Sequence, residues 1–132
     1  MKKLFALGFA AMMMLTLTLT SCNKYEDGPG FSLRSAKARI SRTWKPVEYV
    51  SSNGTTVAAG SSDGTYTFDK DGTFTYTSGS LSASGTWEFN GDKTTITTTI
   101  SGISNTETIT RLSTKELWTK DSNGTVTKSE AQ

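Results

Sequence analysis

The sequence contains no histidine and a single cysteine, Cys22. The absence of histidine excludes Ser–His and Cys–His catalysis and metal sites built on imidazole ligands. A single cysteine cannot form a disulfide within the chain, and no glycine-rich loop of the phosphate-binding type is present. We therefore predict a non-enzymatic protein without catalytic residues, metal or cofactor. The one enzymatic alternative that stays open is a pair of carboxylates, Glu107 with Asp92 or Glu88.

The N-terminus has the layout of a secretory signal peptide. Lys2 and Lys3 are the only charged residues before position 24, and residues 4–19 are mainly Leu, Phe, Ala and Met. This run is short for a membrane-spanning helix, which needs about 20 apolar residues. It ends in Leu19-Thr20-Ser21-Cys22, which resembles the lipobox of bacterial lipoproteins, in which the cysteine thiol receives diacylglycerol. We predict that residues 1–21 are removed and that lipid on Cys22 anchors the chain to a membrane. The alternatives are a secreted protein with an unmodified cysteine and an anchored precursor that stays uncut.

Residues 22–31 form the predicted tether between the lipid and the folded domain. Polar residues, Gly and Pro dominate this segment, which favours a flexible linker. Lys24 followed by the acidic pair Glu26-Asp27 resembles the surface-export signal of Bacteroidetes lipoproteins, although Tyr25 interrupts the motif. The resemblance implies attachment to the outer membrane of the cell envelope, with exposure on the cell surface as one of two orientations. An ordinary polar linker is the alternative.

The mature chain is electrically neutral. Removing the signal takes Lys2 and Lys3 away from the 14 basic residues, so that 12 basic residues face 12 acidic ones. A neutral domain has no general attraction for nucleic acid, and we predict no nucleic-acid partner. Five basic residues lie in one stretch without an acidic residue: Arg34, Lys37, Arg39, Arg42 and Lys45. We interpret them as a solvated helix face, with contact to anionic lipid head groups as the alternative.

The composition changes after position 43 to Thr, Ser, Gly and aromatic residues, which favour strands and turns. Turn signals such as Asp71-Gly72 and Asn90-Gly91 recur about every eight to twelve residues, a spacing typical of an antiparallel barrel or sandwich. Before this change, the sequence predicts one helix over 32–42, capped by Ser32, with Leu33, Ala36 and Ile40 on its packed side. Residues 32–132 are predicted to form one all-β domain with this short helix.

The aromatic residues set the register of the first predicted hairpin. A three-residue loop over 70–72, with Gly72 at positive φ, pairs Phe68 with Phe74 and Tyr66 with Tyr76. One face of this hairpin is then aromatic and the other is polar, as a half-buried hairpin requires.

The next predicted hairpins extend the same inner face. A turn at Asn90-Gly91 aligns Trp87 with Thr94, Gly85 with Ile96 and Leu81 with Ile100. A turn at Ser101-Gly102 then sends the odd-numbered residues of the following strand inward, namely Ile103, Asn105, Glu107, Ile109 and Arg111. Charged residues on an inner face fit either the solvated end of a barrel or polar groups placed inside a cavity.

Several of these segments carry a family resemblance. The run from Gly64 to Tyr76 (GTYTFDKDGTFTY), Gly85-Thr-Trp-Glu-Phe89, and a tryptophan, Trp44, early in the first strand are similar to the lipocalin-like lipoproteins of Bacteroidetes over residues 41–130. The resemblance implies a small up-and-down antiparallel β-barrel of about eight strands. It also implies that Trp44 packs at the closed end of the barrel above the N-terminal helix. Arg42 stands where lipocalins have a glycine, so the match to lipocalins proper is partial.

The resemblance and the inner face together predict a small apolar or amphipathic ligand inside the barrel. The predicted wall residues are Tyr66, Phe68, Phe74, Tyr76, Trp87, Phe89, Ile96, Glu107, Ile109 and Arg111. The alternative is an envelope structural or protein-interaction module, whose barrel these side chains fill without a ligand and whose protein partner is unknown. In that case residues 51–63, a long polar segment, are a contact, a mobile lid or simply a flexible loop.

Overall fold

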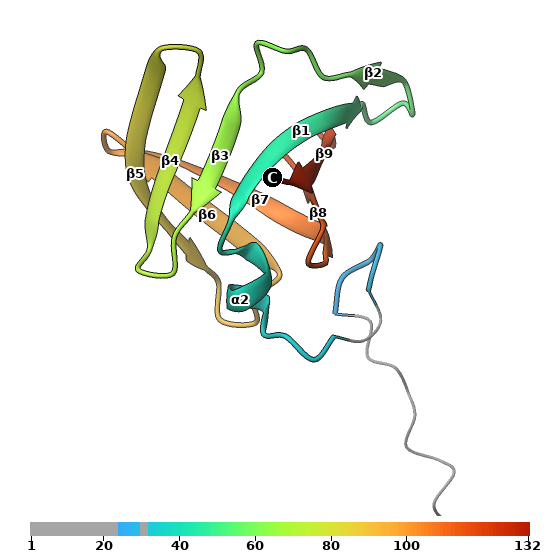
Figure 1. Ribbon diagram of the computed structural model, residues 1–132. Helices are drawn as coiled ribbons and strands as arrows, with labels where there is room; N and C mark the ends of the chain where they lie inside the picture. Colours follow the sequence, from blue (N-terminus) through green and yellow to red (C-terminus); the bar gives the residue numbers. More distant parts are fainter. Residues whose placement is uncertain (1–23, 30–31) are drawn as a thin grey trace, which may run out of the picture.

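The computed structural model describes residues 24–29 and 32–132, which form a β-barrel with one short helix (Figure 1). The predicted signal over residues 1–21 and the predicted lipidation site, Cys22, lie outside the described residues. The elements in chain order are α2 (Ala36–Ile40), β1 (Thr43–Val50), β2 (Thr56–Ala58), β3 (Thr65–Phe68), β4 (Thr73–Ser78), β5 (Leu81–Phe89), β6 (Thr95–Ile100), β7 (Ile103–Leu112), β8 (Glu116–Lys120) and β9 (Val126–Ala131).

The barrel closes because β1 pairs on both sides. Strands β3 to β9 pair antiparallel in sequence order, and β1 joins β3 on one side and β9 on the other. In Figure 1, β1 and β9 accordingly lie side by side. Eight strands thus form a closed barrel, and β2 is an additional strand along β1. The predicted all-β barrel is confirmed.

The segment 51–63 is more ordered than a flexible loop. Its centre forms β2, which pairs with the end of β1 from Glu48 to Val50. The backbone N–H of Ala59 donates to the Val47 carbonyl at 3.0 Å, which continues the pairing beyond β2. Interpreting all of 51–63 as an unpaired loop is therefore wrong at its centre.

The helix is shorter than the sequence predicts. It begins after Ser35, whose hydroxyl accepts a hydrogen bond from the Ala38 N–H at 3.1 Å. Ser32 instead accepts from the Arg34 N–H in a local turn, so it does not cap the helix. Leu33 consequently lies outside the helix and is 92% exposed, which corrects its predicted place on the packed side. The helix ends at Ile40, which is fully buried.

The hairpin of β3 and β4 has the predicted register. Phe68 pairs with Phe74 and Tyr66 with Tyr76, and Gly72 has a φ of 94°, a conformation that favours glycine. The aromatic rings of this hairpin therefore share the inner face of the barrel.

The hairpin of β5 and β6 has a different register from the predicted one. Trp87 pairs with Thr98 and not Thr94, and Phe89 takes the place of Gly85 opposite Ile96. The turn is wider because the Asn90 side-chain oxygen accepts hydrogen bonds from the backbone N–H groups of the two residues that precede and begin β6, Thr94 and Thr95. The shift is an even number of residues, so each side chain keeps its predicted face.

The N-terminal segment 24–29 is held against the barrel. Tyr25 is 1% exposed, and its hydroxyl donates to the Lys93 carbonyl at 3.2 Å. The Asp27 N–H donates to the Thr110 carbonyl on β7 at 2.6 Å. The prediction of a flexible tether is therefore wrong for this part of it, because Tyr25 is a member of the core.

Arg39 departs from the predicted solvated helix face. It is buried, its guanidinium donates to the Leu112 carbonyl, and it lies 5.7 Å from the centre of the Tyr25 ring. Lys37, on the opposite side of the short helix, is exposed. The basic stretch therefore contributes to the closed end of the barrel as well as to its surface.

Candidate functional site

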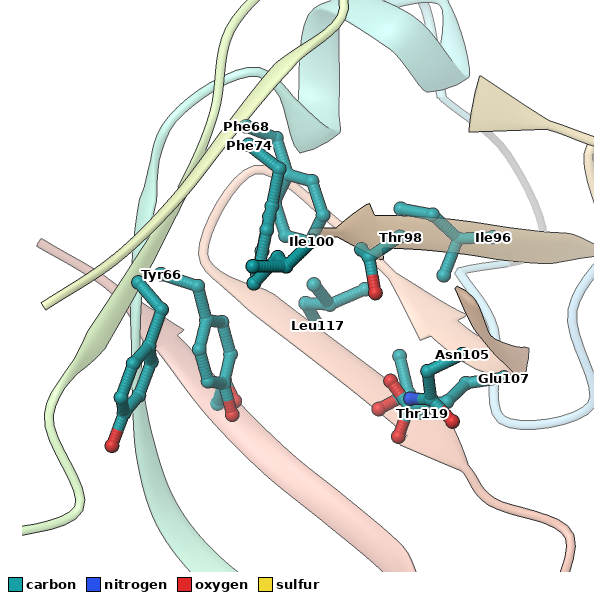
Figure 2. A pocket seen from close by; sticks show the side chains of 12 residues that line it. Tyr66, Phe68, Phe74, Ile96, Thr98, Ile100, Asn105, Glu107, Leu117 and Thr119 are labelled. Carbon is teal, nitrogen blue, oxygen red and sulfur yellow. The ribbon is translucent and has the colours of Figure 1, made fainter. Parts of the chain in front are cut away.

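The barrel contains a cavity of about 280 Å³ (Figure 2). The cavity lies between the aromatic hairpin β3–β4 on one side and strands β6 to β9 on the other. Its lining residues are Tyr66, Phe68, Phe74, Tyr76, Ile96, Thr98, Ile100, Asn105, Glu107, Leu117, Thr119 and Ser129. Side chains therefore do not fill the whole interior.

One end of the cavity is closed and apolar. Trp44 is not a lining residue, but it is fully buried in the core, and its indole N–H donates to the Ile40 carbonyl of α2 at 2.9 Å. Phe68, Phe74 and Leu117 form the adjoining part of the cavity and are all buried. This position of Trp44 above the helix is the one that the resemblance implies.

The other end is open to solvent and partly polar. Tyr66, Tyr76 and Ile100 are only half-buried, and Asn105 is exposed. Figure 2 shows Asn105, Glu107 and Thr119 grouped together, apart from Phe68 and Phe74. A molecule that enters the cavity would place its apolar part toward the helix and its polar part at the open end.

The aromatic side of the cavity is a packed cluster of rings. Tyr66 stacks on Tyr76 with ring centres 6.4 Å apart, and Phe68 packs against Phe74 at 5.2 Å. The Tyr76 hydroxyl donates to the Asp63 carbonyl at 3.3 Å, which fixes that ring at the rim. Burial raises the pKa of the Tyr66 phenol, so Tyr66 stays neutral. This side offers flat apolar ring surfaces to a ligand.

The opposite side carries the only carboxylate among the lining residues, Glu107. Burial raises the pKa of Glu107, and the nearby negative charge of Asp121 raises it further, whereas a hydrogen bond from the Thr119 hydroxyl acts in the opposite direction. Ile96 is the cross-strand partner of Glu107 on β6. The carboxylate is therefore partly desolvated beside an apolar wall.

Six of the ten predicted wall residues line the cavity: Tyr66, Phe68, Phe74, Tyr76, Ile96 and Glu107. Trp87, Phe89 and Ile109 face the interior but belong to the packed part of the core. Trp87 packs edge-on against Phe68 at 5.5 Å and against Phe89 at 5.2 Å. Their side chains are therefore core and not cavity wall.

Arg111 lies outside the barrel, which corrects its predicted inward position. A β-bulge between Ile109 and Arg111 on β7 adds one residue, so that the later residues change face. Leu112 is consequently buried, and Arg111 pairs with Glu116 through a nitrogen–oxygen contact of 2.8 Å. The Arg111 guanidinium also lies 5.4 Å from the Trp118 ring centre.

The sequence prediction missed half of the lining as site residues: Thr98, Ile100, Asn105, Leu117, Thr119 and Ser129. Ile100 and Asn105 have the inward parity that the predicted hairpins give, and Thr98 pairs with Trp87 at an inward position. On β8, Leu117 and Thr119 are two residues apart and both buried, which is the alternation expected of inward-facing residues of a strand. Four of these six side chains are polar, and polar residues do not mark an inner face by hydrophobic alternation.

The carboxylate pairs considered from the sequence are not brought together in the cavity. Glu88 is exposed on the outer face of β5, and Asp92 is exposed and accepts a hydrogen bond from the Thr94 hydroxyl. Across residues 24–29 and 32–132, His, Cys, Asp and Glu form no group of three that could hold a metal ion. The helices of the described segments include none with the length and apolar character to cross a membrane.

Comparisons with known proteins agree with this architecture. A family model described as a lipocalin-like domain matches residues 40–118. The crystal structure of a lipocalin-like protein from Bacteroides uniformis ATCC 8492 aligns with a TM-score of 0.62 and 16% identity, over 71% of this chain and 99% of that one. An uncharacterised protein from Bacteroides eggerthii DSM 20697 aligns with a TM-score of 0.61 and 13% identity, over 70% of this chain and 99% of that one. A search of curated proteins found no match.

Proposed function

Because the chain belongs to the lipocalin-like domain family, we propose that it binds one small apolar or amphipathic molecule inside its barrel. The observation that carries the proposal is the cavity of about 280 Å³, which has an apolar closed end and a partly polar open end. Binding pockets commonly combine apolar walls with a few placed polar groups. A barrel filled by side chains, the alternative without a ligand, fits this interior less well.

Blocking the cavity tests the proposal. Thr98 lines the cavity on β6, whereas its neighbour Thr97 faces outward and is hydrogen-bonded to Thr106. Thr98→Phe should narrow the cavity and strongly reduce the uptake of a fluorescent apolar dye, because a phenyl ring would occupy a large part of the binding volume. Thr97→Phe places the same ring outside and should leave dye uptake unchanged. Equal uptake by both variants, or no uptake by the unmodified protein, would refute cavity binding. Native mass spectrometry of the purified protein would identify the molecule that it carries.

We also propose that the domain works at the outer membrane, held by lipid on Cys22. The apolar run before Leu19-Thr20-Ser21-Cys22 supports the lipid anchor, and Lys24 followed by the acidic pair Glu26-Asp27 supports the outer membrane. Tyr25, three residues after Cys22, is docked at the closed end of the barrel. Three extended residues span at most about 11 Å, so the barrel would lie close to the membrane with its open end directed away from it.

Replacing the cysteine tests the anchor. Cys22→Ala should abolish metabolic labelling with a radioactive fatty acid and leave the uncut precursor in the cell. Ser21→Ala keeps a small residue at the cleavage site and should be labelled and cut as the parent is. Normal processing of the Cys22→Ala variant would return the chain to the class of ordinary secreted proteins.

A further inference from the structure

The size of the cavity suits a small ring compound. A cavity of about 150 Å³ holds benzene, and the cavity here measures about 280 Å³. The space therefore suits one ring or two fused rings with a short side chain. The stacked pair Tyr66 and Tyr76 offers flat surfaces against which such a ring packs well.

The acidic group of the cavity lacks a basic partner in the described part of the chain. The three ion pairs there join Arg111 to Glu116, Lys120 to Glu26 and Lys128 to Glu48, and none includes Glu107. The two lysines on the strands that follow β7 are thus already paired on the outer face. Asp121, the charged neighbour of Glu107, carries the same sign. A partly buried carboxylate beside a like charge is costly unless a cation joins it.

The opposite wall also favours a positive charge. The faces of aromatic rings carry negative electrostatic potential and attract ammonium groups. Tyr66 lies close enough to Glu107 for the carboxylate to influence its titration. A cation between them would be stabilised by the carboxylate on one side and by the tyrosine rings on the other.

From these observations, and resting on the proposed function, we propose that the cavity selects amines. The ligand has a flat ring body that packs against Tyr66, Phe68 and Phe74, and a protonated amino group that binds the Glu107 carboxylate at the open end. Asn105 and Thr119, which line the cavity beside Glu107, supply additional hydrogen-bonding oxygens for the amino group.

The proposal has a definite pH dependence. The groups that face Glu107 are Asp121 beside it and Tyr66 across the cavity, while its β6 partner, Ile96, is neutral. An ammonium group binds the ionised carboxylate, so affinity for an amine should rise as pH rises through the pKa of Glu107. Affinity for a neutral ligand of the same shape should stay nearly constant over this interval.

Three probes with the same indole ring separate the possibilities: tryptamine, the alcohol tryptophol and the acid indole-3-propionate. Isothermal titration calorimetry with the full-length protein should give about tenfold tighter binding for tryptamine than for tryptophol. A hydrogen bond to a charged group contributes at least about a tenfold gain in affinity. Indole-3-propionate should bind least. Equal binding of tryptamine and tryptophol, or tightest binding of the acid, would overturn the amine proposal.

Two variants with the same change in charge locate the effect. Glu107→Gln should reduce tryptamine binding to the level of tryptophol and remove its pH dependence, while retained tryptophol binding shows that the cavity is intact. Glu88→Gln removes an exposed carboxylate on the outer face and should preserve the tenfold preference. A preference that persists in Glu107→Gln would contradict the role of Glu107.

If none of the indoles binds while the Thr98→Phe and Thr97→Phe variants differ in dye uptake, the amine proposal fails and the proposed function stands. Absence of both indole and dye binding refutes the two together.

Discussion

Tyr25 offers a direct test of whether the segment after the predicted lipidation site belongs to the folded domain. Its side chain is 1% exposed, its hydroxyl donates to the Lys93 carbonyl, and the Arg39 guanidinium lies 5.7 Å from its ring centre. Tyr25→Ala removes the ring and these contacts. Truncation of a buried aromatic residue to alanine costs about 3 to 5 kcal/mol, so the free energy of unfolding should fall by about 3 kcal/mol or more.

A graded series separates the contributions of the ring and the hydroxyl. Tyr25→Phe keeps the ring and loses only the hydrogen bond to Lys93, which should cost about 1 kcal/mol. Leu33→Ala is the matched control from the same N-terminal region, because Leu33 is 92% exposed and its loss should change stability by less than about 0.5 kcal/mol.

Urea unfolding followed by tryptophan fluorescence measures these differences, since Trp44 and Trp87 are both buried in the barrel and report its opening. The expected order of stability is parent and Leu33→Ala together, then Tyr25→Phe, then Tyr25→Ala. If Tyr25→Ala unfolds at the same urea concentration as the parent, the segment is not part of the core and the barrel is free to move away from the predicted anchor.

Two further predictions concern single positions in the barrel. A Cβ added at Gly85 would lie 1.8 Å from the Thr99 carbonyl oxygen, so Gly85→Ala should lower the free energy of unfolding in urea by about 3 kcal/mol or more. The control Gly91→Ala should leave the stability unchanged, because no atom lies within 4 Å of the added group. Equal stabilities of the two variants would contradict the close approach of β5 and β6. Burial and the charge of Asp121 raise the pKa of Glu107, so the folded state holds the proton more tightly than the unfolded state and gains stability as pH falls through that pKa. Glu107→Gln should therefore be more stable than the parent at about pH 8, with the difference disappearing toward about pH 4; a difference that is constant with pH would contradict this.

The sequence was most informative where large residues alternate across a short turn. Phe68 and Phe74 share a face only with an odd loop between them, and Gly72 supplies the positive φ that such a loop needs. The β3–β4 hairpin could therefore be predicted to the residue. The Asn90-Gly91 signal was weaker, because the Asn90 side chain can close a wider loop by accepting two backbone hydrogen bonds. The predicted pairing of β5 with β6 is therefore wrong, but the predicted face of each residue is correct, because the register shift is an even number of residues.

Arg111 shows that an alternating sequence pattern carries no information about a β-bulge. Alternation predicts the face of a residue only while the pairing is regular, and the bulge between Ile109 and Arg111 reverses it. The residue types around a bulge do not mark it in a single sequence. The same holds for Tyr25, whose polar neighbours and nearby Gly and Pro predicted a linker, although its partners are Arg39 and Lys93 far along the chain.

Whether a small barrel is filled or hollow depends on residue size at inward positions, and this protein has both arrangements. At the closed end, Trp87 packs edge-on against Phe68, Trp44 is fully buried, and the interior is full. Toward the open end, the inward positions that face the aromatic hairpin carry small or polar side chains: Thr98, Asn105, Thr119 and Ser129. Because these side chains are short, they leave space between their strands and the aromatic hairpin. A partly buried carboxylate at this place lowers stability and contributes nothing to packing, so Glu107 is the residue on which the proposed amine site depends most.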